Sequence, residues 1–243
     1  MGETRSGGIR LKDKYTVRSI DPRLAQRVII ERHYLHRKAP CSFAFGLFDE
    51  NDTLVGVVIY GVPASSTLLR GICGDEHKQN VYELTRLWVA DDAPPNGESY
   101  LIGNSITKLD REIVVSFADS SQEHIGYVYQ ATNFLYTGLS SKFKDPKVRG
   151  LEHQHHATWG NGLTYEQLKE KFGEDRVYFV ERPRKHRYVY FNASPRRKKQ
   201  LLQALRYKVL PYPKGSAPVP NTSNSQTYKS STDEYDQPKL FAI

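Results

Sequence analysis

The sequence predicts an α/β fold in which a mixed central sheet is flanked by helices, with a basic C-terminal extension. Three observations support this prediction. Residues 42–48 and 53–60 are apolar runs joined by a polar turn, which is typical of an antiparallel hairpin. Residues 80–119 follow the order strand, Gly-containing turn, helix, strand, as a parallel β-α-β unit does. Residues 176–191 contain two further alternating strands. Antiparallel and parallel parts combined give a mixed sheet with helices on both faces.

The N-terminal elements begin with a strand at 15–20. Asp21 is a suitable N-cap and Pro22 a suitable first residue for a helix over 22–35, whose inner face carries apolar residues at helical spacing. The hairpin follows this helix. Residues 64–79 are less regular and are predicted to be an insertion before the central strand.

The central strand over 80–89 alternates apolar and polar residues. The turn at 94–99 interrupts the chain, and Ser99 is the predicted N-cap of the next helix. A short apolar strand at 113–119 ends on an acid. Helical spacing of apolar residues predicts one more helix between 126 and 138.

The C-terminal part begins with strands at 176–180 and 186–191 and continues with a basic helix from 195 to about 207. From 214 onward Ser, Thr, Asn and Pro dominate, which predicts disorder. The predicted organisation is a catalytic domain over 14–192, a basic helix with a Pro/Tyr segment over 193–214, and a disordered tail over 215–243.

Composition narrows the class of protein. A chain of 243 residues with 38% hydrophobic content can bury one sizeable core. It contains no apolar run of about 18 residues, and its start is polar, so we expect a soluble intracellular protein. Only Cys41 and Cys73 are present, which argues against a disulfide framework and excludes a cysteine-based zinc site.

Positive charge is concentrated in one segment. The net charge is +8, yet eleven Lys and Arg and no acid lie between Arg182 and Lys214, and the rest of the chain is net negative. Such a segment, interleaved with tyrosines, is typical of a polyanion-binding surface, although a solvated basic face is the alternative. The candidate DNA-binding residues are Arg184, Lys185, Arg187, Arg196, Arg197, Lys198 and Lys199.

The turn at 94–99 suits an anion. A helix that starts after a Gly turn presents free N–H groups and the positive end of its dipole. The pyrophosphate of a nucleotide-like donor is the most obvious ligand for this position.

The order of elements over 14–192 resembles the GNAT acyltransferase superfamily. This resemblance implies that the central strand and the following turn hold the pantetheine and pyrophosphate of acetyl-CoA. The family's turn has the form Gln/Arg-x-x-Gly-x-Gly/Ala, and here Pro94 replaces the first residue. The implied cofactor-binding residues are Leu87, Trp88, Val89, Asn96, Gly97, Glu98, Ser99 and Tyr100.

A closer resemblance is to the bacteriophage Mom family. The segments that carry it are 32–37, 83–89, 116–119, 185–188 and 211–214. Mom proteins are GNAT-like enzymes that add an acetamido (carbamoylmethyl) group to adenine N6 in phage DNA and so shield it from host restriction. The resemblance implies duplex DNA as substrate and a phage-encoded protein acting in the host cytoplasm. Acetyl-CoA, an aminoacyl-tRNA or another group donor all remain open.

His33 and Asp119 are the first catalytic candidates. His33 lies at a helix end, where an imidazole can titrate near pH 7, and Asp119 lies at the carboxyl end of a strand, the edge where α/β sheets bind ligands. The resemblance marks both as essential. Adenine N6 is a weak nucleophile because its lone pair is delocalised, so an acceptor for its proton has a clear task. The alternative is that each residue only caps its local element.

Tyr34 and Tyr127 are candidates for stacking on an extruded adenine or for donating a proton. His153, His155 and His156 form the densest histidine cluster, close to Glu152. Their spacing matches no established metal site, so we expect a polar loop and no metal, with iron as the alternative that the resemblance allows.

Two rival functions stay open. One is a GNAT N-acetyltransferase acting on a protein or a small amine, and the other is a non-catalytic DNA-binding protein with the same fold. A homodimer is also compatible with the sequence.

Overall fold

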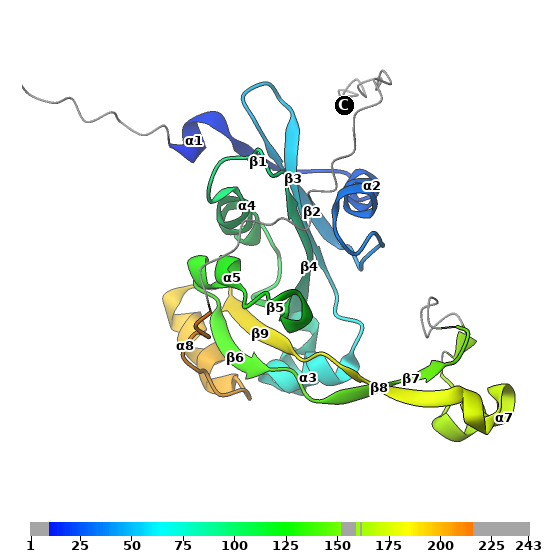
Figure 1. Ribbon diagram of the computed structural model, residues 1–243. Helices are drawn as coiled ribbons and strands as arrows, with labels where there is room; N and C mark the ends of the chain where they lie inside the picture. Colours follow the sequence, from blue (N-terminus) through cyan, green and yellow to red (C-terminus); the bar gives the residue numbers. More distant parts are fainter. Residues whose placement is uncertain (1–9, 152–158, 161, 216–243) are drawn as a thin grey trace, which may run out of the picture.

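A seven-stranded sheet forms the centre of the molecule (Figure 1). The computed structural model describes residues 10–151, 159–160 and 162–215. Strand order in the main sheet is β1-β2-β3-β4-β5-β9-β6, and β7 pairs with β8 in a separate two-stranded sheet. Within the main sheet β4 and β5 run parallel, while the other neighbouring strands are antiparallel. This confirms the predicted mixed sheet with flanking helices.

The N-terminal half contains these elements: α1 Leu11–Lys14, β1 Thr16–Ser19, α2 Pro22–Arg32, β2 Phe43–Phe48, β3 Leu54–Gly61, α3 Ser66–Cys73, the 3-10 helix η1 Asp75–Asn80, and β4 Val81–Val89.

The C-terminal half contains α4 Gly97–Ile106, β5 Ile113–Asp119, η2 Ser120–Gln122, α5 Tyr127–Ala131, β6 Leu135–Leu139, β7 Phe143–Val148, α7 Tyr165–Phe172, η3 Glu174–Arg176, β8 Val177–Arg182, β9 Lys185–Phe191 and α8 Pro195–Ala204.

The predicted helix at 126–138 is wrong. The chain forms the short helix α5 and then the edge strand β6, which pairs with β9. Asn133 lies between them in the left-handed region at φ 60°, which ends the helix and reverses the chain. The apolar residues at helical spacing therefore belong to two elements, and they pack into two clusters: Val128 and Tyr136 into the main core, and Leu135 into the cluster on the other face of the sheet.

Smaller corrections concern element ends and the insertion. The insertion at 64–79 is helical, with Ser65 capping α3. α2 ends at Arg32, three residues earlier than predicted, and α8 ends at Ala204 rather than near Tyr207. The strand predicted at 176–180 lies outside the main sheet as part of β8.

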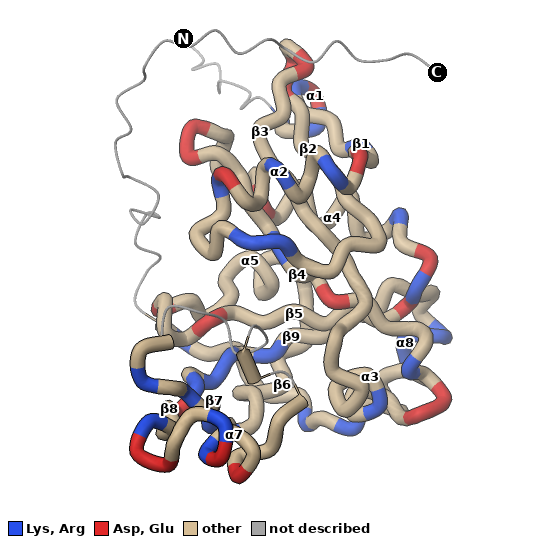
Figure 2. The backbone as a smooth tube through the Cα atoms, turned by 90° about the vertical axis from the view of Figure 1, so that its right-hand side faces the viewer, with Lys and Arg blue, Asp and Glu red and all other residues tan. Residues whose placement is uncertain are grey.

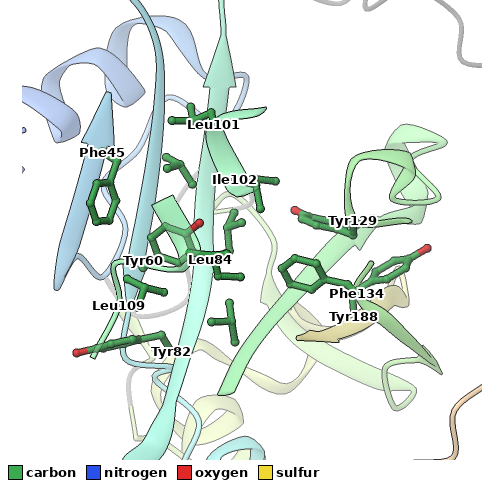
Figure 3. Close-up of a cluster of buried hydrophobic side chains, with 14 of the residues drawn as sticks. Phe45, Tyr60, Tyr82, Leu84, Leu101, Ile102, Leu109, Tyr129, Phe134 and Tyr188 are labelled. Atoms are coloured by element: carbon green, nitrogen blue, oxygen red, sulfur yellow. The ribbon is translucent and has the colours of Figure 1, made fainter. Parts of the chain in front are cut away.

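The main core lies where α4 and α5 cover one face of the sheet (Figure 3). Tyr60, Leu101, Ile102, Phe134 and Tyr188 are fully buried there. A second cluster on the other face includes Leu201 of α8, so the start of the basic extension packs against the sheet. This packing aligns β4, β5 and β9 side by side.

The β4–β5 pairing is short and has a structural consequence. It covers Val81–Glu83 against Ile113–Val115 and then stops. Beyond that point β4 continues along β3 up to Val89, and β5 continues along β9 up to Asp119. The register of β4 on β3 shifts between Leu84 and Arg86, as at a β-bulge. Two neighbouring parallel strands therefore separate after Glu83.

A buried hydroxyl pair links this core to α4 and gives a test of the fold. The Tyr60 hydroxyl lies 2.8 Å from Ser105 Oγ, and Ser105 Oγ also donates to the carbonyl of Ile102. We expect Ser105→Ala to lower the free energy of unfolding by about 1–3 kcal/mol, because the Tyr60 hydroxyl is left buried without its partner.

Urea titration measures this effect. The double variant Tyr60→Phe/Ser105→Ala is the matched control, since it removes both hydroxyls and should be more stable than the sum of the two single changes predicts. Strict additivity would contradict the role given to this pair.

Candidate active site

A cleft of about 1130 Å³ opens where β4 and β5 separate. Its walls come from the end of α2, the second half of β4, the first turn of α4, the segment that follows β5, and the start of β9. His33, Tyr34, Glu83, Arg86 and Asp119 all line it. The separation of the strands therefore brings together the three catalytic candidates predicted from the sequence and two residues that were not predicted.

His33 is the C-cap of α2 and is only 8% exposed. Its Nδ1 accepts a hydrogen bond from the backbone N–H of Leu35 at 3.1 Å, and its ring stacks on Tyr34 with centroids 4.4 Å apart. Burial, and then the charges of Arg86 and neighbouring residues, lower the pKa of His33 to about 4. At neutral pH the ring is therefore neutral, with Nδ1 as acceptor and the proton on Nε2. The expectation of a base titrating near pH 7 is wrong.

Tyr34 is 39% exposed on the cleft wall. Its ring meets the His124 ring edge-on, with centroids 6.3 Å apart. Burial, and then the carboxylate of Asp119, raise the pKa of the Tyr34 hydroxyl, so it stays protonated. The pair His33–Tyr34 thus presents one stacked aromatic surface with hydrogen-bond donors.

Asp119 ends β5 and is held on two sides. It accepts hydrogen bonds from the N–H and the hydroxyl of Ser121, at 3.0 and 2.7 Å, and its other oxygen lies 3.2 Å from Lys185 Nζ. Burial favours a higher pKa, but these hydrogen bonds and the Lys185 charge outweigh it, so the pKa of Asp119 is lowered. Asp119 therefore caps the turn after β5 and is also an ionised carboxylate in the cleft, which makes it a weak base.

Glu83 and Arg86 were not predicted from the sequence. Glu83 is the last residue of β4 that pairs with β5, so its side chain lies where the two strands separate. Burial raises the pKa of Glu83, although Arg86 and Lys185 partly oppose that effect. Within the described ranges the buried Nε of Arg86 has no hydrogen-bond partner. A carboxylate and a guanidinium in the central strand of the sheet are the sequence signal that would have identified them.

The predicted donor-binding residues line two different cavities. Leu87, Trp88, Val89 and Glu98 line the cleft, whereas Asn96, Ser99 and Tyr100 line a smaller cavity of about 430 Å³ together with residues of α1 and the 131–134 turn. Gly97 is buried and lines neither.

The cap of α4 also differs from the prediction. Its N-cap is Asn96, at φ 68°, and the Ser99 hydroxyl donates to the Asn96 carbonyl instead of capping. Burial raises the pKa of Glu98, whose carboxyl faces the cleft from the first turn of α4. A carboxylate here takes the place in which a pyrophosphate was expected, and like charges repel. The pyrophosphate site at 94–99 stays a prediction, with Glu98 as the group that would oppose it while ionised.

The basic segment is divided between two places. Lys185 and Arg187 line the cleft, and Arg187 is fixed by hydrogen bonds to Thr137 and by the Tyr207 ring, 3.4 Å from its guanidinium carbon. Arg184 donates to the carbonyls of Ser140 and Leu139. These cations lie at or near the start of β9.

The other candidates lie on α8, which follows the far end of β9 (Figures 1 and 2). Arg197 is occupied by Glu112, with an N–O distance of 3.0 Å. Arg196, Lys198 and Lys199 are the remaining cations of this cluster. The segment therefore forms two separate basic surfaces.

The histidine cluster His153, His155 and His156 lies outside the described residues. In the part of the chain that the structure describes, no group of three or more His, Cys, Asp or Glu is arranged to hold a metal ion. The same part contains no helix long and apolar enough to span a bilayer.

Comparisons with known proteins agree with the sequence resemblance. The profile of the Mom protein family matches residues 14–214. The protein "Methylcarbamoylase mom" of Escherichia phage Mu is 30% identical over 213 residues, which cover 82% of this chain and 83% of the relative.

Among solved structures, the spermidine/spermine N-acetyltransferase SpeG from Vibrio cholerae matches with a TM-score of 0.41 at 10% identity, over 78% of this chain and 99% of that one. The ribosomal-protein-S5-alanine acetyltransferase from Vibrio fischeri matches with a TM-score of 0.41 at 12% identity, over 74% and 94%. At these scores the likeness concerns only the broad arrangement of strands and helices. The family match spans the cleft from His33 to Tyr207, and the chain belongs to the Mom protein family.

Proposed function

We propose that this protein is a phage enzyme that adds a carbamoylmethyl (acetamido) group to adenine N6 in duplex DNA, inside the host cell, and so protects the DNA from restriction. The observation that carries the proposal is the match to the Mom family over all of the cleft-lining residues from His33 to Tyr207, together with a 30% identical methylcarbamoylase from phage Mu.

Glu83 is the proton acceptor in this proposal. Adenine N6 becomes a useful nucleophile only as its proton leaves, and the best acceptor has a pKa raised towards the working pH. Burial raises the pKa of Glu83, whereas the pKa values of Asp119 and His33 are lowered. Glu83 also lies in the fork between β4 and β5 and, within the described ranges, forms no ion pair. It therefore accepts the N6 proton as the new bond to the transferred group forms.

His33 and Arg86 are hydrogen-bond donors in this scheme. The neutral His33 ring has its Nδ1 occupied by the Leu35 N–H, so Nε2–H is the group free to donate to substrate. The buried Nε of Arg86 needs an acceptor, and a carbonyl or carboxyl oxygen of the transferred group supplies one. Asp119 holds Lys185 at the cleft wall, and Tyr34 stacks on the adenine ring.

The donor is proposed to be an acyl or aminoacyl carrier that brings the nitrogen of the carbamoylmethyl group, because the acetyl group of acetyl-CoA has no amide nitrogen and would give N6-acetyladenine instead. As the bond to N6 forms, the bond between the group and its carrier breaks, and the carrier leaves with that electron pair. Its apolar chain fits against Leu87, Trp88 and Val89, which line one end of the cleft. Glu98 beside them opposes a pyrophosphate while it is ionised. When bound, the donor supplies the activated group, and the residues above act on the adenine side of the reaction.

Nucleoside mass spectrometry of DNA from cells that express the protein tests the function directly. We expect deoxyadenosine heavier by one carbamoylmethyl group. His33→Asn keeps an acceptor for the Leu35 N–H but removes the Nε2 donor, and it should lower the modified fraction about 100-fold. Asp119→Asn should also lower it, because the Lys185 ion pair is lost.

Gln122→Ala, an exposed position on the same cleft, is the matched control and should modify DNA like the parent. DNA with only ordinary deoxyadenosine from the parent strain would exclude the function, and modified protein or polyamine in its place would favour the N-acetyltransferase alternative.

Glu83→Gln tests the proton acceptor. The amide keeps the shape but has no basic oxygen, so the initial rate in a donor-containing cell extract should fall by about 100-fold or more. For the parent, the rate should fall as the pH drops through the raised pKa of Glu83, because the protonated acid cannot accept the N6 proton. His33, with a pKa of about 4, should add no step near pH 6.5.

Glu123→Gln, an exposed acid on the same cleft, is the control for charge alone and should retain the parent rate. A full rate for Glu83→Gln would assign the proton to another group.

The α8 cations are proposed to contact DNA phosphates. Changing Arg196, Lys198 and Lys199 to Ser leaves the Arg197–Glu112 ion pair intact. Each lost phosphate contact should flatten the slope of log affinity against log salt by about 0.9, without changing sequence preference. Filter binding over a salt series measures the slope. An unchanged slope would mean that the α8 cations are solvated and do not contact DNA.

A further inference from the structure

We propose that Phe143 is a wedge that enters the DNA base stack when the target adenine leaves it, and that the face of the β7–β8 ribbon around Phe143 is where the flanking duplex lies. This inference rests on the proposed function.

Phe143 lines the cleft and, at 59%, is the most exposed large apolar side chain among the described residues. It is the first residue of β7 and lies opposite Arg182 of β8. The β7–β8 ribbon extends away from the main sheet, with α7 near its outer end (Figure 1). A large aromatic ring at such a place stays in water unless a partner covers it.

The ring is held in position by charged neighbours. The guanidinium of Arg182 lies 5.1 Å from its centroid. Arg182 in turn makes two hydrogen bonds to Asp145, at 2.8 and 2.6 Å. Because Asp145 lies on the same strand as Phe143, the three side chains form one fixed array on one face of the ribbon. A preorganised aromatic ring loses little conformational entropy on binding.

The opposite face of the ribbon packs against α7, although Phe179 on it is still 47% exposed. Phe179 pairs with Pro146 there and packs against Tyr165 of α7, with ring centroids 4.5 Å apart. Val148 and Val177 on the same face belong to a small buried cluster with Leu168. The face with Phe143 is therefore the one available to a partner.

The geometry of the cleft requires the adenine to leave the helix. Glu83 is half-buried in the fork between β4 and β5, whereas Tyr34 and Phe143, which line the same cleft, are 39% and 59% exposed. A stacked base cannot bring its N6 to that depth, so it has to be extruded. Extrusion leaves a gap in the stack, and apolar side chains fill such gaps in DNA-bending proteins.

Charge favours DNA as the occupant of this face. Lys147 lies on the same face of β7 as Phe143 and Asp145, and Lys185 and Arg187 continue the positive charge into the cleft. Phosphates on either side of the extruded nucleotide would contact these cations while Phe143 stacks between the neighbouring bases.

Base extrusion can be measured without the donor. The probe is a short duplex copied from a site that the parent modifies in cells, with 2-aminopurine in place of the target adenine, whose fluorescence rises when it unstacks. The parent should raise the fluorescence on binding. Phe143→Ala should abolish most of the rise and weaken duplex binding about tenfold, since one stacking contact is lost.

Three further measurements separate this role from loss of folding. Phe143→Leu keeps an apolar wedge and should retain most of the fluorescence rise. Phe179→Ala, a change at an exposed Phe on the opposite face of the same ribbon, should behave like the parent. Phe143→Ala should bind a single strand as tightly as the parent does, because no base has to be unstacked there.

A full fluorescence rise with Phe143→Ala would overturn the wedge, and so would equal losses on duplex and single strand. If the parent modifies DNA in cells but gives no fluorescence rise with this duplex, the wedge is wrong and the proposed function stands. If the parent leaves cellular deoxyadenosine unmodified, the proposed function itself fails.

Discussion

The separation of β4 from β5 after Glu83 is the constraint on which the site depends. Each strand keeps its other neighbour, β3 for β4 and β9 for β5, so backbone hydrogen bonds remain satisfied on one side while the sheet opens on the other. The opening creates the cleft without breaking the core, because α4 and α5 cover the strands from one face. The mixed sheet thus contains a cleft between β4 and β5, and each of these two strands is still fixed by its pairing with β3 or β9.

The electrostatics of the cleft follow from its depth. Burial acts in opposite directions on its titratable groups, since it disfavours whichever form is charged. It lowers the pKa of His33 to about 4 and raises that of Glu83, while hydrogen bonds and Lys185 keep Asp119 ionised. The three titratable residues of the cleft therefore differ in protonation and in the chemistry open to them. His33 is a neutral hydrogen-bond donor, Glu83 is an acid with a raised pKa, and Asp119 is a carboxylate held by hydrogen bonds and by Lys185.

The sequence determined the fold class and most of the strands, but neither β6 nor β7. Period-two alternation identified β4, and the polar turn identified the β2–β3 hairpin, because both signals arise from local geometry. His33 was expected at a helix end and Asp119 at the crevice edge of the sheet, and both line the cleft together with Tyr34, while their catalytic roles stay predictions. Motif order also identified the Mom family, which the family match bears out.

Only the tertiary structure decided the remaining features, because the spacing of residues along the chain does not show which distant segments pack together. The apolar residues at 126–138 suit a helix locally, yet pairing with β9 makes half of them a strand. The roles of Glu83 and Arg86 depend on where β5 leaves β4, and the tautomer of His33 depends on the Leu35 N–H. The basic segment, continuous in sequence, is divided by the length of β9, since a strand of seven residues separates its ends by about 20 Å.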